Sequence, residues 1–333
     1  MVQYGWMALS LSLLGSFGQA ALRPDPPNVC SSCDEWNQPR EPFRVFGNTY
    51  YVGTDGLSAM LITSDQGHIL LDGGLAQSAP LIAANIRKLG FKIEDVKFIT
   101  NSHAHYDHAA GIAALQRASG AIVVASASGA QALASGNATP DDPQAGFGRD
   151  ANAFPAVKNV RVVKNGEVVR VGPIAIEMHD TAGHTPGSTT WTWQSCESSA
   201  PSPKPSTSAQ ASASAKATAD KTADRQVSSP SKCLNIVYAD SLTPVAAPGF
   251  RFTGDAKTPS RVDKFRASIA TVAALPCDIV ITTHPSATNL AGKLKLRAAK
   301  PAADPLIDPQ GCRALAATAA RQLDARVAEE GKK

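Results

Sequence analysis

Three histidines and one aspartate fall within six positions of this sequence, directly after an apolar run. The run covers residues 96–100 (VKFIT), and residues 101–108 read NSHAHYDH. The run predicts a strand, and side chains just past the end of a strand lie in a loop where they can hold a ligand. A single tetrahedral zinc ion could not use all four side chains. The cluster therefore predicts two metal ions and, as a first hypothesis, a two-metal hydrolase; its ligands would be His103, His105, Asp107 and His108.

The composition is that of an ordinary globular protein. The chain has 333 residues, of which 43% are hydrophobic and 18% charged, so it can bury one large core or two modest ones. The formal net charge is only +4, and no basic stripe is visible. We therefore expect no nucleic-acid partner.

The amino terminus has the pattern of an export signal. Residues 7–15 (MALSLSLLG) form a short apolar stretch, and small residues follow at 18–20. We predict a cleaved signal peptide over residues 1–20, a periplasmic location and no stable membrane anchor, because the stretch is too short to span a bilayer comfortably. The region before it lacks Lys and Arg, which leaves an uncleaved anchor as the alternative.

Six cysteines in an exported chain indicate disulfide bonds. Six cysteines can pair in many ways, and the sequence alone does not choose among them. The Cys-Ser-Ser-Cys spacing could also indicate a redox motif, but it lies in a proline-rich leader and not between a strand and a helix. Our interpretation is a sequential pairing: Cys30–Cys33, Cys196–Cys233 and Cys277–Cys312.

Strands and helices alternate along most of the chain. Alternating apolar residues and Gly or Asn turns predict a first meander of strands, an amphipathic helix up to Gly90 follows, and another helix begins near Ala109. A long loop spans residues 136–155. A second meander follows, so the predicted strands are 43–45, 49–52, 60–63, 68–71, 96–100, 121–125, 160–163, 168–171, 174–178 and 189–193.

Residues 197–232 contain one Val and otherwise no large apolar side chain, so we predict a disordered insertion. A bond between its flanking cysteines would make it a hairpin loop between strands 189–194 and 235–238. Beyond it, Thr258 and Pro259 indicate the start of a helix, 279–282 is a strand, and apolar residues at steps of four indicate a C-terminal helix. Residues 21–333 then form a single domain, an αβ/βα four-layer sandwich of two mixed β-sheets flanked by helices.

Two more histidines follow apolar strands and lie among turn residues. His184 is part of Gly-His-Thr-Pro-Gly, and His284 precedes Pro285. His68 and His179 lie inside strand patterns instead, where an isolated histidine usually has a packing role. We therefore add only His184 and His284 to the cluster.

With these residues in place, the chain resembles the metallo-β-lactamase superfamily, and more narrowly its subclass B3 β-lactamases. The resemblance covers about residues 36–322 outside the insertion. It depends on HAHYDH and on four further segments, LLDGG at 70–74, AGHTPGST at 182–189, YADSL at 238–242, and LPCD at 275–278 followed by His284.

The resemblance implies two zinc ions per chain. The first would be held by His103, His105 and His184, and the second by Asp107, His108 and His284. It implies hydrolysis of the lactam amide of penicillins, cephalosporins and carbapenems by a metal-bound hydroxide, with Asp107 orienting the attacking water. We expect a monomer with a small-molecule β-lactam substrate.

The resemblance also implies four substrate contacts. Ser241 stands where subclass B1 has a cysteine ligand, and with Thr243 it would contact the substrate carboxylate or an ordered water. Trp36 and Phe147 would form aromatic walls of the cleft. Each of the four could equally be an ordinary turn or packing residue.

Three alternatives remain open. A thioester or lactone hydrolase of the same superfamily, like glyoxalase II or a lactonase, would use Asp240 as a bridging metal ligand. A non-catalytic periplasmic zinc-binding protein would keep the ligands without turnover. A nuclease would need a basic face or an added nucleic-acid domain, and neither is visible in the sequence.

Overall fold

The computed structural model describes residues 22–197, 232–256, 258–300 and 304–332. The predicted signal peptide and nearly all of the predicted insertion lie outside these ranges. Within them, no helix is long and apolar enough to cross a membrane.

The first sheet has seven strands in sequence order. Its first four strands pair antiparallel and its last three follow in parallel. The strands are β1 (Phe43–Phe46), β2 (Thr49–Tyr51), β3 (Met60–Ile62), β4 (His68–Leu71), β5 (Val96–Thr100), β6 (Ile122–Ala125) and β7 (Val160–Val162).

The second sheet has five strands in the order β12-β11-β10-β9-β8. All neighbours pair antiparallel except β11 and β12, which are parallel. The strands are β8 (Val168–Val171), β9 (Ile174–Asp180), β10 (Thr189–Cys196), β11 (Cys233–Ala239) and β12 (Ile279–Thr282).

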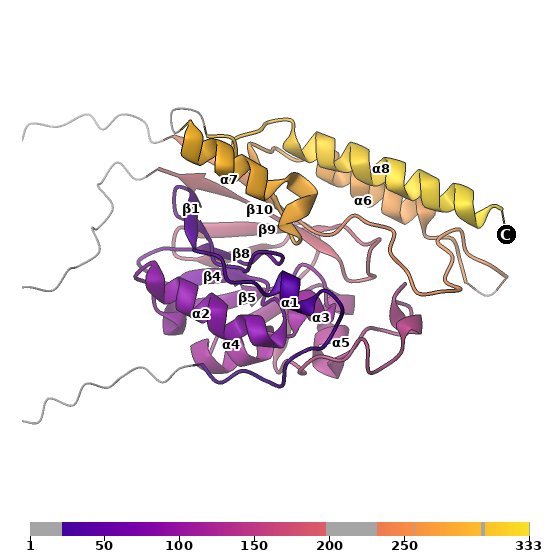
Figure 1. The fold of residues 1–333 in the computed structure, drawn as a ribbon, viewed down its shortest axis with the longest axis horizontal. Coiled ribbons are helices and arrows are strands. Elements are labelled where there is room, and N and C mark those ends of the chain that lie inside the picture. Colours follow the sequence, from indigo (N-terminus) through magenta and orange to yellow (C-terminus); the bar gives the residue numbers. More distant parts are fainter. Residues whose placement is uncertain (1–21, 198–231, 257, 301–303, 333) are drawn as a thin grey trace, which may run out of the picture.

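Helices cover the outer face of each sheet, and the two sheets face each other (Figure 1). One apolar cluster fills the space between the sheets, with Trp191 and Tyr51 fully buried in it, and two further clusters lie under the helices. The predicted αβ/βα sandwich is therefore confirmed. The helices are α1 (Cys33–Trp36), α2 (Ala79–Lys88), α3 (Tyr106–Ala109), α4 (Ile112–Ser119), α5 (Ala127–Ser135), α6 (Val262–Ala274), α7 (Leu290–Ala299) and α8 (Gly311–Glu330), with short 3-10 turns η1 (Ala76–Ser78), η2 (Ile93–Asp95), η3 (Ala145–Phe147) and η4 (Pro285–Thr288).

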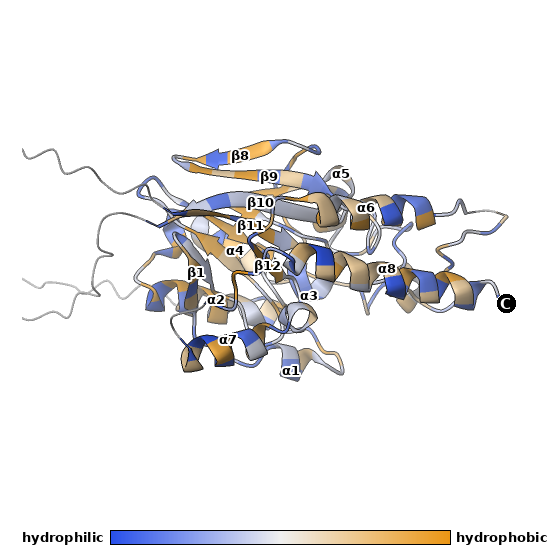
Figure 2. Cartoon of the chain, turned by 90° about the horizontal axis from the view of Figure 1, so that it is seen from above, coloured by the Kyte–Doolittle hydropathy of each residue, from blue (hydrophilic) through white to orange (hydrophobic). Residues whose placement is uncertain are grey.

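Hydropathy follows this layering (Figure 2). The strands are mostly apolar, whereas α2, α7 and α8 alternate between hydrophilic and hydrophobic residues along their length, as helices with one buried face do. In α8 the buried residues include Ala316, Ala319 and Leu323. The predicted C-terminal helix over the core is thus confirmed.

The sequential disulfide pairing is also confirmed, with bonds Cys30–Cys33, Cys196–Cys233 and Cys277–Cys312. Cys196 and Cys233 are direct partners in the β10–β11 ladder. The predicted hairpin between these two strands is therefore present, and its cystine closes the end from which the insertion departs.

Two sequence expectations were wrong. Strand β7 does not join the second meander but pairs in parallel with β6 in the first sheet, because its residues follow the crossover helix α5, which the sequence did not predict. Helix α6 begins at Val262 with Arg261 as its N-cap. Thr258 instead donates its backbone N–H and its hydroxyl to Asp255, so it belongs to a preceding turn.

Candidate metal centre

A buried carboxylate shapes the loop that follows β5. Asp72 lies at the end of β4 with a positive φ of 61° and no exposed surface. It accepts hydrogen bonds from the backbone N–H of Ser102 at 2.7 Å, the Ser102 hydroxyl at 2.6 Å and the Tyr238 hydroxyl at 2.8 Å. These bonds connect the ends of β4, β5 and β11, and they hold the start of the histidine cluster in one position.

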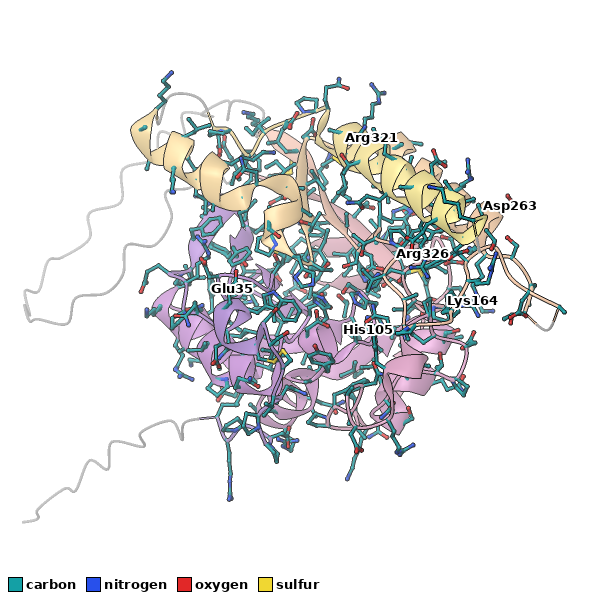
Figure 3. All side chains as sticks on the ribbon, turned by 45° about the vertical axis from the view of Figure 1, so that its right-hand side comes forward. Glu35, His105, Lys164, Asp263, Arg321 and Arg326 are labelled. Carbon is teal, nitrogen blue, oxygen red and sulfur yellow. A yellow bond between two sulfur atoms is a disulfide. The ribbon has the colours of Figure 1, made fainter. Side chains whose placement is uncertain are left out.

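Three histidine rings from two loops meet at one point. Possible ligand atoms of His103, His105 and His184 all lie within 4.8 Å of one another, and all three residues are buried. The ring centroids are 4.8 to 5.0 Å apart, with interplanar angles of 72° to 90°. His105 lies between the two halves of the sandwich, away from the outer surface (Figure 3).

Each of these rings uses one nitrogen for a partner outside the group. A ring nitrogen that donates to such a partner leaves the other nitrogen with a lone pair for a metal. The Nε2 atom of His103 is buried and has no hydrogen-bond partner. The outer contacts join His103 Nδ1 to Asp240 Oδ1 at 2.7 Å, His105 Nε2 to Asp142 Oδ1 at 3.1 Å and His184 Nδ1 to the Thr243 carbonyl oxygen at 2.8 Å.

A second group lies beside the first. Asp107 Oδ2 is 3.1 Å from both His108 Nε2 and His284 Nε2, and the two Nε2 atoms are 3.2 Å apart. Ligands bound at about 2.0 Å around a tetrahedral zinc are separated by roughly 3.3 Å. The triangle of donor atoms therefore has the size that one ion requires.

The two groups adjoin at His103 and His108, whose ring centroids are 4.4 Å apart. His103 also falls within ligand distance of Asp107 and His108. The Nε2 atom of His284 forms a tighter triangle with Asp107 and His108, and its place in the second group stays a prediction. The arrangement fits two neighbouring ions.

The electrostatics differ between the groups. Burial, followed by the neighbouring histidine rings, holds the pKa of His103 well below its usual value and lowers that of His184 to about 3, so both rings are neutral. Burial alone would raise the pKa of Asp107, but His108 and His284 outweigh it and keep the carboxylate ionised. Neutral imidazoles and one carboxylate are donors that suit a divalent ion of borderline softness.

Comparisons with known proteins agree with this geometry. Residues 52–197 match the family model described as the metallo-beta-lactamase superfamily. The Rm3 metallo-beta-lactamase is 45% identical, with 91% of this chain and 100% of that chain covered and a TM-score of 0.77. The chain belongs to the metallo-β-lactamase superfamily.

Further relatives narrow the position within this superfamily. MEM-A1, a subclass B3 metallo-beta-lactamase from a soil metagenome library, is 44% identical over 89% of this chain and 99% of its own, with a TM-score of 0.75. SMB-1, solved with 2-mercaptoethanesulfonate bound, is 40% identical over 89% and 99%, with a TM-score of 0.73. The resemblance to subclass B3 stated from the sequence is confirmed.

Three of the four predicted substrate contacts, Trp36, Ser241 and Thr243, touch a predicted metal ligand or the residue next to one. The Trp36 ring is 5.1 Å from that of His284, and the Ser241 hydroxyl is 2.8 Å from that of Thr283. Phe147 is 48% exposed and ends the short turn η3, which begins directly after Gln144. The Nε2 atom of Gln144 is 3.4 Å from His184 Nε2. Contact of these residues with a substrate stays a prediction.

Thr243 has a clear structural role as well. Its backbone oxygen and its hydroxyl lie 2.8 and 3.2 Å from His184 Nδ1. It therefore orients a predicted metal ligand, in addition to any contact with substrate.

The two histidines interpreted as structural lie outside both groups. His68 packs edge-on against the Phe91 ring, with centroids 5.1 Å apart. His179 Nε2 is 2.8 Å from the Thr192 hydroxyl.

Sequence reasoning missed the carboxylates that orient the histidines. No sequence pattern pointed to Asp142, because it lies in an irregular loop whose position relative to His105 depends on the tertiary structure. Asp240 was considered only as a bridging metal ligand, and the structure places it behind His103, at the nitrogen that points away from the centre. The one sequence feature that could have indicated this role is the position of Asp240, an acidic residue directly after the buried strand β11.

Proposed function

We propose that this chain is a zinc-dependent β-lactamase of subclass B3 that hydrolyses the lactam amide of penicillins, cephalosporins and carbapenems. One observation carries the proposal, namely two adjoining groups of ligand atoms, one of three buried histidines and one that contains an ionised aspartate. The likeness to Rm3, MEM-A1 and SMB-1 over nearly their full lengths supports the substrate class.

In this proposal His103, His105 and His184 hold the first zinc ion, and Asp107, His108 and His284 hold the second. When bound, two zinc ions polarise a carbonyl oxygen and make water a nucleophile at neutral pH. The chain's own residues supply the alignment that this chemistry needs.

Among these residues, Asp107 would take part in the reaction itself. Its side chain keeps 11% of its surface exposed, so a small molecule can reach it, and its lowered pKa keeps the carboxylate ionised. We infer that the carboxylate accepts a hydrogen bond from the attacking water and so orients it toward the carbonyl. The Ser241 hydroxyl, next to that of Thr283, would donate to the carboxylate of the substrate.

The rim around the centre suits a small organic substrate. Large hydrophobic side chains are exposed at Val29 in the N-terminal arm, at Phe147 in the long loop and at Val245, two residues after Thr243. Exposed apolar side chains around a polar centre are typical of ligand sites. With Trp36, they would shield the scissile bond from bulk water.

The position of Asp240 argues against the thioester and lactone alternative. There the aspartate would bridge the two metals, but its Oδ1 atom lies 2.7 Å from His103 Nδ1, on the far side of the ring from the centre. A zinc-binding protein without turnover would not need the partly exposed Asp107 and His284 beside the buried histidines.

We further propose that residues 1–20 direct export to the periplasm, that residues 21–333 act as a monomeric single domain, and that the metal is zinc. The three disulfides support an oxidising compartment.

One spectrophotometric screen tests the proposal. A carbapenem, a cephalosporin, a thioester and a lactone are each incubated with the protein, with and without a chelator. We expect chelator-sensitive hydrolysis of both β-lactams and no effect of serine-directed inhibitors. Rapid thioester or lactone turnover without β-lactam turnover would refute the lactamase assignment.

A further inference from the structure

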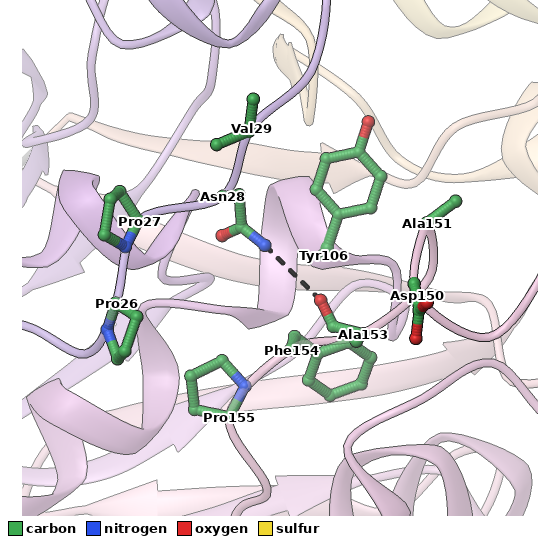
Figure 4. A pocket seen from close by; sticks show the side chains of 10 residues that line it. All are labelled: Pro26, Pro27, Asn28, Val29, Tyr106, Asp150, Ala151, Ala153, Phe154 and Pro155. Carbon is green, nitrogen blue, oxygen red and sulfur yellow. Dashed lines mark hydrogen bonds between the residues drawn. The ribbon is translucent and has the colours of Figure 1, made fainter.

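A pocket lies between the N-terminal arm and the long loop, and Tyr106 of helix α3 forms part of its lining (Figure 4). Its volume is about 400 Å³, within the usual size of small-molecule sites. Neither the family match nor the sequence analysis assigned it a role. The residues that matter below are Pro27, Val29, Tyr106, Asp150, Phe154 and Pro155.

The pocket borders the metal centre. Tyr106 lines it and directly precedes Asp107 on α3. Tyr106 also packs in one apolar cluster with Trp36, whose ring lies against His284. The opposite wall belongs to the same loop as Gln144, next to His184. Both walls therefore continue to residues beside the predicted zinc ligands.

The N-terminal wall is held by a reciprocal set of hydrogen bonds at Asn28. Its N–H donates to Gln77 Oε1 and its carbonyl accepts from Gln77 Nε2, both at 2.9 Å. Its side chain accepts from the N–H of Ala76 at 3.0 Å and donates to the carbonyl of Ala153 at 3.4 Å across the pocket. A wall fixed before binding lowers the entropic cost of binding.

The lining combines flat apolar surfaces with one negative charge. Tyr106, Phe154 and the prolines present faces on which an aromatic ring can pack. Asp150 is the only charged residue that lines the pocket, and no ion pair joins it to any residue that the structure describes. An aromatic ring that carries a nearby cation matches this combination.

We propose that this pocket binds an arylglycyl group, a ring with an ammonium on the adjacent carbon, and that Asp150 pairs with the ammonium. The inference rests on the proposed function, because such a group is the acyl side chain of aminopenicillins and of many cephalosporins. That side chain leaves the lactam ring at the carbon beside the scissile carbonyl. With the carbonyl at the metal centre, the proposal places this side chain in the pocket that Tyr106 lines.

The test compares two substrates that differ only in the ammonium, ampicillin and benzylpenicillin. The readout is the ratio of their kcat/KM values, in Asp150→Asn and in the matched control Asp65→Asn, an exposed carboxylate at the opposite end of β4. Because Asp150 is exposed, its pairing is partly screened, and we expect Asp150→Asn to lower the ratio by about threefold at low ionic strength. Asp65→Asn should leave it unchanged.

A third variant separates this pocket from a neighbouring one beside Trp36, which is lined by Glu35, Arg40 and Asp55. If the ratio falls in Glu35→Gln and not in Asp150→Asn, the ammonium binds there and the inference is wrong. An unchanged ratio in Asp150→Asn, or an equal fall in the Asp65→Asn control, overturns it too.

A binding measurement distinguishes failure of the inference from failure of the proposed function. D-Phenylglycinamide and its uncharged N-acetyl derivative are titrated into the protein and followed by NMR. We expect tighter binding of the cation, lost in Asp150→Asn. If neither penicillin is hydrolysed but this difference persists, the lactamase proposal fails and the pocket assignment stands. Equal binding of the two compounds refutes the assignment whatever the hydrolysis.

Discussion

Replacing Asp240 should weaken zinc binding without removing a zinc ligand. Asp240 Oδ1 and His103 Nδ1 are 2.7 Å apart, and the two side chains are 0% and 1% exposed, so bulk water does not reach the contact. Loss of a carboxylate behind a metal-bound histidine typically costs about 10- to 100-fold in metal affinity. That range corresponds to about 1.4 to 2.7 kcal/mol.

Asp240→Asn and Asp240→Ala should fall at the two ends of this range of lost zinc affinity. In Asp240→Asn the amide oxygen can still accept the Nδ1 proton of His103, so we expect a loss near tenfold. In Asp240→Ala nothing orients the ring, and we expect a loss near 100-fold. Zinc dissociation constants are measured by competition with a chelating indicator, with Asp65→Asn as the matched control.

Two results would contradict this reasoning. Unchanged zinc affinity in Asp240→Ala would show that the contact does not support the ligand. A fall from two bound zinc ions to one, at saturating zinc, would mean that Asp240 is itself a ligand, as in the thioester and lactone hydrolases. The melting temperature of each metal-free variant shows whether the fold has survived.

The remaining predictions concern the second metal group, the Cys196–Cys233 disulfide, the segment between its two cysteines and the C-terminal helix. His284→Ala should bind one zinc per chain by elemental analysis, and two zincs would contradict the ligand assignment. The double variant Cys196→Ser/Cys233→Ser opens a loop with a sequence separation of 37 and should lower the free energy of unfolding by about 4 kcal/mol in urea, whereas no change would rule out a stabilising role. Deleting residues 199–230 with both cysteines kept should preserve activity, and loss of folding would show that the segment is structural. Burial would raise the pKa of Glu330, but hydrogen bonds from the Thr253 and Phe252 N–H groups and from Arg326 outweigh burial and lower it. The ionised Glu330 carboxylate therefore stabilises the fold above its unfolded pKa of about 4.5. This stabilisation is lost as the pH falls through the lower pKa of the folded state. Glu330→Gln should therefore cost about 1–3 kcal/mol at pH 7 and less at pH 4, and an equal cost at both pH values would contradict this account.

Strands were easier to predict from the sequence than helices. The strands carry large β-branched and aromatic residues with clear turn signals, and each was predicted near its observed bounds. Helix α5 was missed because its buried face consists mostly of Gly129, Ala130 and Ala132. The helix also packs closely against the loop at Gly187, where an added Cβ would overlap the backbone nitrogen of Gly129. Periodicity of large apolar residues cannot reveal such a helix.

The sequence by itself determined which side chains could bind metal. His103, His105, Asp107 and His108 are close because they are adjacent in the chain, and the strand before them was evident from its composition. His184 and His284 were added because they lie among turn residues just after apolar strands, and the resemblance then divided the six side chains between two zinc sites. These features are local in the sequence, so they can be recognised without knowledge of the fold.

Only the tertiary structure decided how those ligands are oriented. Asp142, Asp240 and the Thr243 carbonyl come from separate loops, and each meets one histidine nitrogen at 2.7 to 3.1 Å. The pocket beside α3 likewise forms only where the N-terminal arm crosses the long loop. Hydrogen bonds and packing between segments far apart in sequence depend on three-dimensional distance, which the order of residues does not specify.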